Sequence, residues 1–204
     1  YVVLADDLKE QGVIFTDIET ALKEHHDLVH KYLMNAVDVR ENRLTALHTA
    51  TMNGGTFLYV PKNVDIEVPL QTVNWKDDPE AGLINHVLIV ADDHSSVTYV
   101  ENYVSDDHGH PSVANIIAEV FVGQNARVKY GAVDNLAKDV TTYVNRRGHI
   151  ARDGRIEWAI GQMNDGHGLY DQTTDLVGDG SYGDVKSVSV GRGEQSQNFV
   201  TCVH

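Results

Sequence analysis

The feature that most constrains the fold is an alternation of apolar and polar residues that recurs about every 30 residues from Thr56 onward. Successive side chains of a strand point to opposite faces of its sheet, so each run predicts a strand with one buried face. The apolar residues that open successive runs lie 33, 31, 28 and 29 residues apart: Val64, Val97, Val128, Ile156 and Val185. Strands repeating at this interval are typical of a solenoid whose coils stack on one another. We therefore predict a mainly β protein, a parallel β-helix of roughly 30-residue coils; a β-sandwich is the alternative.

Turn residues separate the alternating runs. The first run, residues 64–70, alternates apolar residues with Asp65, Glu67 and Pro69 and is predicted to be a strand. Clusters of glycine, asparagine and aspartate, which favour turns, follow the later runs at 92–94, 123–125, 153–154 and 178–180. Residues 178–183 also match the GxGxxG pattern of dinucleotide-binding loops, but a strand pattern follows it where a helix is required. We interpret this stretch as a turn between coils.

The first part of the chain has a helical pattern. Residues 16–35 are predicted to form a helix, because Thr16 begins a capping box and apolar residues follow at helical spacing. A shorter helix is predicted over 41–53, with Leu44 and Leu47 facing the core and a pair of glycines ending it.

These patterns divide the chain into a partly helical N-terminal segment, 1–55, and a β-helix core domain, 56–204. The chain begins at Tyr1 rather than at methionine, and its last run, 199–204, breaks off inside a strand pattern. We therefore expect a piece of a longer protein, truncated within its core domain.

Charge and composition exclude several classes of protein. The chain has 30 acidic and 16 basic residues, a net charge of −14, which disfavours binding to nucleic acid or to an anionic membrane surface. No apolar run approaches the roughly 20 residues of a membrane-spanning helix. The single cysteine, Cys202, cannot form an internal disulfide. These features predict a cytoplasmic protein.

Few residues are candidates for chemistry. His108 and His110 follow two aspartates in one loop, a combination that could hold zinc or iron if further ligands converge. Cys202 could act as a nucleophile or an iron ligand, and His204 lies two residues later, on the same face of a strand. These four are weak metal-ligand candidates, and a solvated loop or a packed thiol explains them as well. No catalytic motif is specific enough to predict an active site.

Five segments of the chain match a known family: residues 53–64, 67–71, 86–93, 143–148 and 191–195. They resemble the SufB/SufD family of iron–sulfur cluster assembly proteins. The similarity extends over almost all of residues 1–204 and is greatest to SufD of low-GC Gram-positive bacteria. One departure favours SufD over SufB: Tyr103 stands where SufB has the cysteine of a Glu-Gly-Cys-Thr-Ala-Pro stretch.

The resemblance implies a right-handed parallel β-helix and a cytoplasmic complex with a SufB-like subunit and a SufC-like ATPase. It implies a supporting role in iron delivery, no active site and no resident cofactor in this stretch, with an iron–sulfur cluster held transiently by the full complex. The family's partner-binding and candidate cluster-ligand residues lie beyond His204, so none is carried onto this chain. A homodimer is left open.

Two other functions are carried as alternatives. The first is a β-helix enzyme that acts on a carbohydrate or polyanion through surface carboxylates, namely Asp65, Glu67, Glu119 and Glu157. The second is a metal-storing protein, suggested by the 11 histidines. The preferred hypothesis is a scaffold subunit for iron–sulfur cluster assembly.

Overall fold

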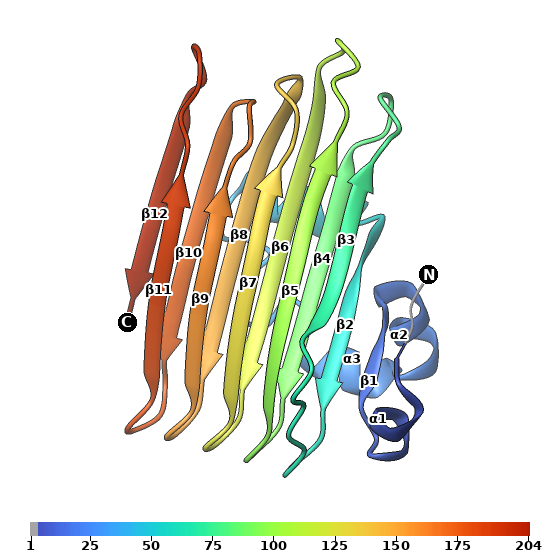
Figure 1. Ribbon diagram of the computed structural model, residues 1–204, viewed down its shortest axis with the longest axis vertical. Coiled ribbons are helices and arrows are strands. Elements are labelled where there is room, and N and C mark those ends of the chain that lie inside the picture. The colour runs from blue at the N-terminus through green and yellow to red at the C-terminus, as the bar shows by residue number, and fades with distance from the viewer. Residues whose placement is uncertain (1–3) are drawn as a thin grey trace.

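The computed structural model describes residues 4–204, in which short helices precede a long stack of strands (Figure 1). Residues 1–3, with which the predicted N-terminal segment begins, lie outside the described residues. The helices are α1 (Asp6–Glu10), α2 (Ile18–Glu24), α3 (His26–Tyr32) and α4 (Arg43–Thr51). The strands are β1 (Ile14–Asp17), β2 (Gly54–Val60), β3 (Leu70–Lys76), β4 (Leu83–Ala91), β5 (Ser96–Ser105), β6 (Ser112–Val122), β7 (Arg127–Asn135), β8 (Val140–Ile150), β9 (Arg155–Gln162), β10 (Gly168–Leu176), β11 (Tyr182–Ser189) and β12 (Gln197–Val203).

Each coil contributes one strand to each of two sheets. The seven-stranded sheet has the order β1-β2-β4-β6-β8-β10-β12, and the five-stranded sheet has the order β11-β9-β7-β5-β3. Every neighbouring pair is parallel except β1 with β2. The chain thus advances by one strand in each sheet per coil, which makes a β-solenoid of about five turns. This arrangement confirms the predicted parallel β-helix rather than a sandwich, whose sheets are antiparallel.

The turns that join the two sheets stack as regularly as the strands. A left-handed residue occupies each of four successive turns: Asn63 (φ 62°), His94 (φ 60°), Asn125 (φ 55°) and Asp153 (φ 56°). Its backbone N–H donates to a carbonyl of the next turn, as from His94 to Gln124 and from Asn125 to Arg152. Asparagine and aspartate tolerate this conformation better than most residues, which explains why they mark the repeat.

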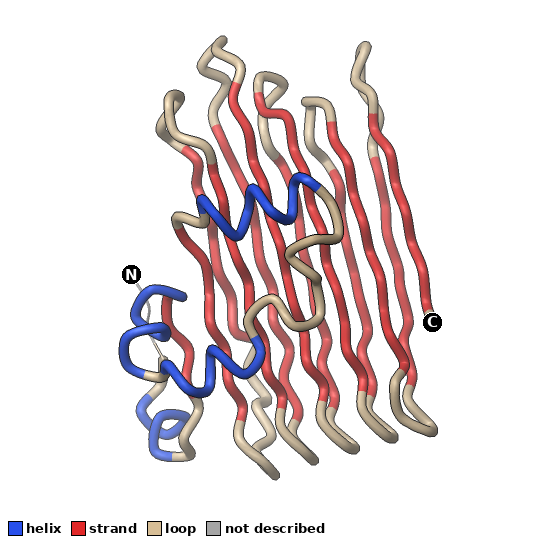
Figure 2. Tube along the Cα trace, turned by 180° about the vertical axis from the view of Figure 1, so that it is seen from behind, coloured by secondary structure: helices blue, strands red, loops and turns tan. Residues whose placement is uncertain are grey.

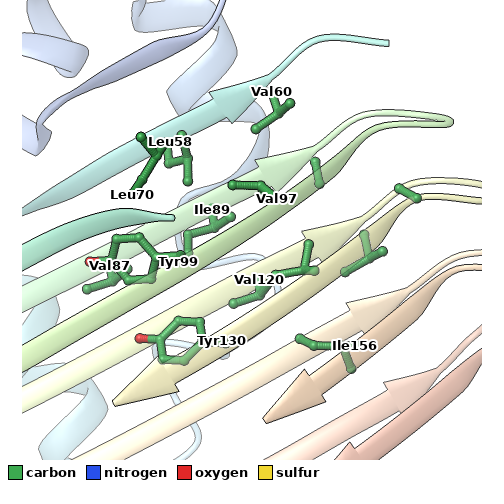
Figure 3. Packing of buried hydrophobic residues seen from close by; sticks show 14 of the residues in the cluster. Leu58, Val60, Leu70, Val87, Ile89, Val97, Tyr99, Val120, Tyr130 and Ile156 are labelled. Carbon is green, nitrogen blue, oxygen red and sulfur yellow. The ribbon is translucent and has the colours of Figure 1, made fainter. Parts of the chain in front are cut away.

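The apolar core fills the space between the sheets (Figure 3). Leu58, Ile89 and Val120 project into it from the seven-stranded sheet and meet Tyr99 and Tyr130 from the five-stranded sheet. The two tyrosine rings lie 5.3 Å apart, and the ladder of aromatic rings continues to Trp158, 4.8 Å from Tyr130. Like residues therefore stack from coil to coil, which is what the sequence period predicts.

The repeat is in register in the middle of the chain and shifted at both ends. Val97, Val128 and Ile156 are direct partners on neighbouring strands. Val185, in contrast, pairs with Trp158, and Asp65 is bridged to Ser96, so Val64 also falls out of line with Val97. Both shifts are of two residues, and a shift of two keeps the apolar side chains on the buried face.

Two predicted elements need correction. Residues 64–69 form no strand apart from the bridge at Asp65, and Val68 is 70% exposed; the strand begins at Leu70, because Pro69 cannot donate to the ladder. The predicted helix over 16–35 is α2 and α3, separated at His25, after a short strand.

The helix caps and faces also differ from expectation. Asp17, and not Thr16, caps α2 by accepting from the N–H of Thr20. In α4, Leu47 is 46% exposed, whereas Thr45 and His48 are fully buried. The helix faces the sheet with polar residues because its partners there are polar.

Candidate functional site

From residue 18 to residue 52, the N-terminal segment lies across the outer face of the seven-stranded sheet, opposite the core (Figure 2). Its first part, α2 and α3, packs apolar side chains such as Ile18 and Val29 on Phe57 and Leu88. Its second part, which we call the strap, comprises residues 33–52, a loop followed by α4. The strap is attached mainly through polar contacts.

Glu119 of β6 is the main attachment point of the strap. Its side chain is fully buried, although it stands in an otherwise apolar stretch of strand. Glu119 Oε1 accepts from the backbone N–H groups of Ala36 (2.7 Å) and Val37 (2.9 Å), and Oε2 accepts from that of Met34 (2.6 Å). Met34 has a φ of 55°, so the loop turns back on itself and its N–H groups converge on one carboxylate. The loop is an anion-binding nest occupied by a carboxylate from the outer face of β6.

A chain of buried side chains leads from Glu119 to α4. His86 Nε2 lies 3.2 Å from Glu119 Oε2, His86 Nδ1 lies 3.1 Å from His48 Nε2, and His48 Nδ1 lies 3.1 Å from Asn115 Oδ1. Burial, reinforced by the neighbouring His86, lowers the pKa of His48 to about 4. His48 is therefore neutral at pH 7.

The hydrogen bonds of this chain determine its tautomers. Asn115 Nδ2 donates to the carbonyl of Leu44, so Asn115 Oδ1 faces His48 and accepts from its Nδ1. Neutral His48 then accepts from His86 through Nε2. His86 Nε2 faces Glu119 Oε2 at 3.2 Å without forming a hydrogen bond. The hydrogen bonds among His48, His86, Asn115 and Leu44 hold α4 of the strap to the sheet.

A second set of contacts fixes the other side of the strap. Glu41 pairs with Arg147 of β8 at 2.9 Å, and Asn145 Nδ2 donates to Glu41 at 3.0 Å. Asn42, which caps α4, donates to the hydroxyl of Tyr143. The strap is thus bound to β4, β6 and β8 at several points, so its position over the sheet is well determined.

An apolar groove of about 250 Å³ opens beside α4. Leu44 and Leu47 of the helix form one side, and Val113, Tyr143 and Leu169 of the sheet contribute to the other. The groove exposes apolar surface, since Leu47, Val113 and Leu169 are each between 46% and 49% exposed. Its lining offers contact surface rather than an array of catalytic groups.

A separate ionic cluster lies inside the solenoid. Arg146 of β8 projects inward and pairs with Asp134 at 2.7 Å and with Glu101 at 3.0 Å. Glu101 also accepts from the hydroxyl groups of Tyr130 (2.6 Å) and Tyr103 (3.1 Å). All five side chains are at most 1% exposed.

Two carboxylates share one guanidinium in this cluster. Burial raises the pKa of Glu101, and Arg146 opposes that rise. Burial also disfavours the charged form of Arg146, but the two carboxylates outweigh it and raise the pKa of its guanidinium. Such a cluster fixes the register of neighbouring coils, since any shift would leave a buried charge unpaired.

The four predicted ligand candidates are scattered. His108 and His110 lie in the loop between β5 and β6, where the backbone N–H of His108 donates to Asp139. Cys202 is partly buried on β12, opposite Thr173, and His204 follows that strand with an exposed side chain. Within residues 4–204, no three His, Cys, Asp or Glu side chains converge in a metal-binding arrangement. A metal role for these four residues stays a prediction.

The GxGxxG segment lies at a turn between strands, as predicted. Gly178 and Gly180 belong to the connection from β10 to β11, and a strand follows, so the nucleotide-binding arrangement is not present in this segment. Gly178 is required there by packing, since an added Cβ would lie 2.1 Å from the backbone nitrogen of Arg152.

One carboxylate on which the enzyme alternative depends is not at the surface. Glu119 was expected on the surface and is fully buried, because the strap covers it. Glu157 lies on the other sheet, on β9. The carboxylates named for that alternative therefore do not line one face.

Sequence reasoning missed the two buried networks. The signal for each was a charged residue inside an apolar or alternating run: Glu119 within β6, Glu101 at an inward position of β5, and Arg146 within β8. Lone charged residues at such positions are almost never buried without a partner. Periodicity cannot identify that partner, which for Glu119 lies more than 80 residues away.

Comparison with known proteins gives a consistent result along the chain. Residues 4–72 match the family described as SufBD protein N-terminal region, and residues 73–204 match the SUF system FeS cluster assembly, SufBD core domain. The chain is 60% identical over 200 residues to the iron–sulfur cluster assembly protein SufD of Bacillus subtilis, covering 97% of the chain and 46% of that protein. Iron–sulfur cluster assembly SufBD family proteins of Staphylococcus epidermidis and Staphylococcus aureus are 31% identical over 199 residues, 97% of the chain and 43% of each.

The chain spans somewhat under half the length of these relatives. In the part of the chain that the structure describes, no helix is both long and apolar enough to cross a membrane.

Proposed function

The chain belongs to the SufBD family of iron–sulfur cluster assembly proteins, and from that premise we propose that it is part of a SufD-like scaffold subunit. The observation that carries the proposal is its 60% identity to SufD of Bacillus subtilis, maintained over 97% of the chain. The scaffold works in the cytoplasm with a SufB-like subunit and a SufC-like ATPase and supports iron delivery to the cluster under assembly. The cluster is cargo of the whole complex.

The architecture supports a scaffold rather than an enzyme. Its least exposed charged side chains each have fixed partners within the fold; they are Glu101, Glu119, Asp134 and Arg146. Stacked coils with interlocked turns resist bending, because each coil is bonded to its neighbours along the full length of both sheets. A stiff body of this kind can hold partner subunits at a fixed separation while an ATPase moves.

Co-purification tests the proposal. The full-length protein is expressed with its SufB-like and SufC-like neighbours and purified anaerobically by a tag on this subunit alone. We expect all three subunits to elute together in a fixed ratio and to accept a cluster on reconstitution with iron and sulfide. A matched control carries Glu157→Gln, an exposed change on the five-stranded sheet.

Recovery of the tagged protein alone, under conditions in which the other two subunits bind each other, would contradict the partner assignment. Turnover of a polysaccharide by the purified protein would instead support the enzyme alternative. Complex formation without any effect of the subunit on cluster yield would limit the proposal to a structural role.

A further inference from the structure

The two sheets of the solenoid end differently on their N-terminal side. The seven-stranded sheet ends in the four-residue strand β1, which pairs with β2 in antiparallel register. The edge of the five-stranded sheet is β3, and within residues 4–204 no strand pairs with its outer side. One sheet therefore ends in a short antiparallel strand, and the other ends in the seven-residue parallel strand β3.

The open edge presents regularly spaced backbone groups. Ser96 donates to the carbonyl of Val64 and accepts from the N–H of Ile66, so alternate residues of β5 bond toward the segment that contains β3. In a parallel pair, a residue that lies directly opposite such a β5 residue points its own N–H and C=O away from β5. Val100 is four residues after Ser96 on β5, so its backbone N–H and C=O point the same way, and it lies opposite Gln71. The backbone groups of Gln71, Val73 and Trp75 thus point away from β5. Gln71 lines a cavity shared with α1, and Val73 and Trp75 lie beyond that cavity.

The side chains of β3 suit the addition of a further strand. Val73 and Trp75, on the outer face, are 61% and 62% exposed, which leaves two large apolar side chains without cross-strand neighbours on one side. On the inner face, Asn74 Nδ2 is buried without a hydrogen-bond partner. Between Pro69 and the buried Lys76, the stretch Leu70–Trp75 contains neither a charged residue nor a proline to protect the edge.

Acidic residues lie at both ends of this edge. Asp65 and Glu67 precede β3, and Asp77, Asp78 and Glu80 follow it, all with exposed side chains. Lys76, the one basic residue in this stretch, is 5% exposed and donates to the carbonyl of Asp78. The edge is therefore apolar in its middle and negative at its ends.

From this arrangement we propose that β3 is a docking edge for an extended segment of a partner protein with basic residues at both ends. The segment adds to the five-stranded sheet as a sixth strand. Its outer side chains are apolar and contact Val73 and Trp75, and a hydroxyl or amide on its inner face accepts from Asn74. Main-chain hydrogen bonds supply affinity, and the flanking charges supply specificity and rate.

A second copy of the chain does not fit the same edge. Antiparallel pairing of two β3 strands would place Asp77 and Asp78 of one copy beside Asp65 and Glu67 of the other, and parallel pairing would also bring acid to acid. Two bodies that each carry a net charge of −14 also repel one another at low ionic strength. The acidic ends of the edge instead favour a basic partner segment.

Synthetic peptides test the proposal on the full-length protein. The probe is Lys-Lys-Val-Thr-Val-Thr-Val-Lys-Lys, and the control has glutamate in place of every lysine. Titration calorimetry is expected to show saturable binding of the lysine peptide, at least ten-fold tighter than the glutamate peptide and weaker at higher salt. Hydrogen exchange should show new protection over residues 70–76.

Two variants localise the binding. Val73→Pro removes an edge N–H that bonds to no strand of the fold, and Val73→Lys places a charge on the edge; each should weaken binding at least ten-fold with an unchanged melting temperature. Val188→Lys, on β11 at the far side of the sheet, is the matched control and should leave binding unchanged.

Four outcomes would overturn the proposal. They are the absence of saturable binding of the lysine peptide up to millimolar concentration, equal binding of both peptides, binding by both Val73 variants as tight as that of the unmodified protein, and a dimer in sedimentation that Val73→Lys dissociates. The last would identify a second copy as the occupant. If Val73→Pro does not fold, Val73→Lys decides alone.

Discussion

Replacement of Glu119 by glutamine should release the strap from the solenoid. Oε1 of the carboxylate accepts two backbone N–H groups, at 2.7 and 2.9 Å, so the amide oxygen of glutamine must take that place. The amide NH2 then replaces Oε2. It can donate to His86 Nε2, but it faces the N–H of Met34, which donated to Oε2 at 2.6 Å. The buried N–H of Met34 then faces the amide NH2, which is also a donor, and has no acceptor.

The magnitude follows from this geometry. An unsatisfied buried donor costs about 1–3 kcal/mol, so Glu119→Gln should lower the stability of the strap by that amount. At about 1.4 kcal/mol per factor of ten, amide exchange in residues 33–42 should accelerate roughly 5- to 150-fold. Glu119→Ala removes the acceptor of all three N–H groups and should lower the stability of the strap by about 3–5 kcal/mol. Removing one partner of a buried ion pair has a cost of this size.

Hydrogen exchange measured by mass spectrometry, together with urea unfolding, tests this reasoning. Faster exchange should be confined to the strap in Glu119→Gln, while the strands β6 and β8 remain protected. Glu157→Gln, the same change at an exposed strand position, serves as control and should alter stability by less than about 0.5 kcal/mol. If Glu119→Gln and the control are indistinguishable, the nest does not hold the strap and the reasoning is refuted.

Three further predictions concern other parts of the fold. Because the pKa of His48 is lowered to about 4 in the folded state, the unfolded chain takes up the proton first, and stability should fall as pH drops from about 6.5 toward 4. The loss between pH 7 and pH 5 should be about 2 kcal/mol, and urea titrations of His48→Gln should show it largely abolished. Arg146→Met strands two buried carboxylates and should cost about 3–5 kcal/mol in chemical unfolding, whereas neutralising all three charges together should cost less; equal losses would contradict the ionic account. Gly178→Ala should destabilise by about 1–3 kcal/mol in thermal melts because its Cβ would meet the backbone of Arg152, whereas Gly191→Ala, with nothing within 4 Å, should be neutral.

The sequence by itself determined the architecture of the core domain. Alternation fixed which face of each strand is buried, the recurring turn residues fixed where coils change sheet, and the interval fixed the stacking of Val97 on Val128 and of Val128 on Ile156. These are local properties, because a strand's side-chain period and a turn's left-handed residue depend only on nearby residues. The family resemblance was likewise visible in short segments and was confirmed by the matches along the chain.

Only the tertiary structure decided how the N-terminal segment is attached and what the buried charges do. The inward face of α4 was predicted from its leucines, yet Thr45 and His48 face the sheet, because their partners, Asn115 and His86, are supplied by strands far away in sequence. The sequence predicts Glu119 to be a surface carboxylate, but the strap covers it and its side chain is buried. A polar residue is stable in the interior only when a hydrogen-bond partner satisfies it. Periodicity carries no information about a partner that lies far away in the sequence and is brought close only by folding. The same holds for the open edge of β3, since which strand lacks a neighbour is a property of the assembled sheet.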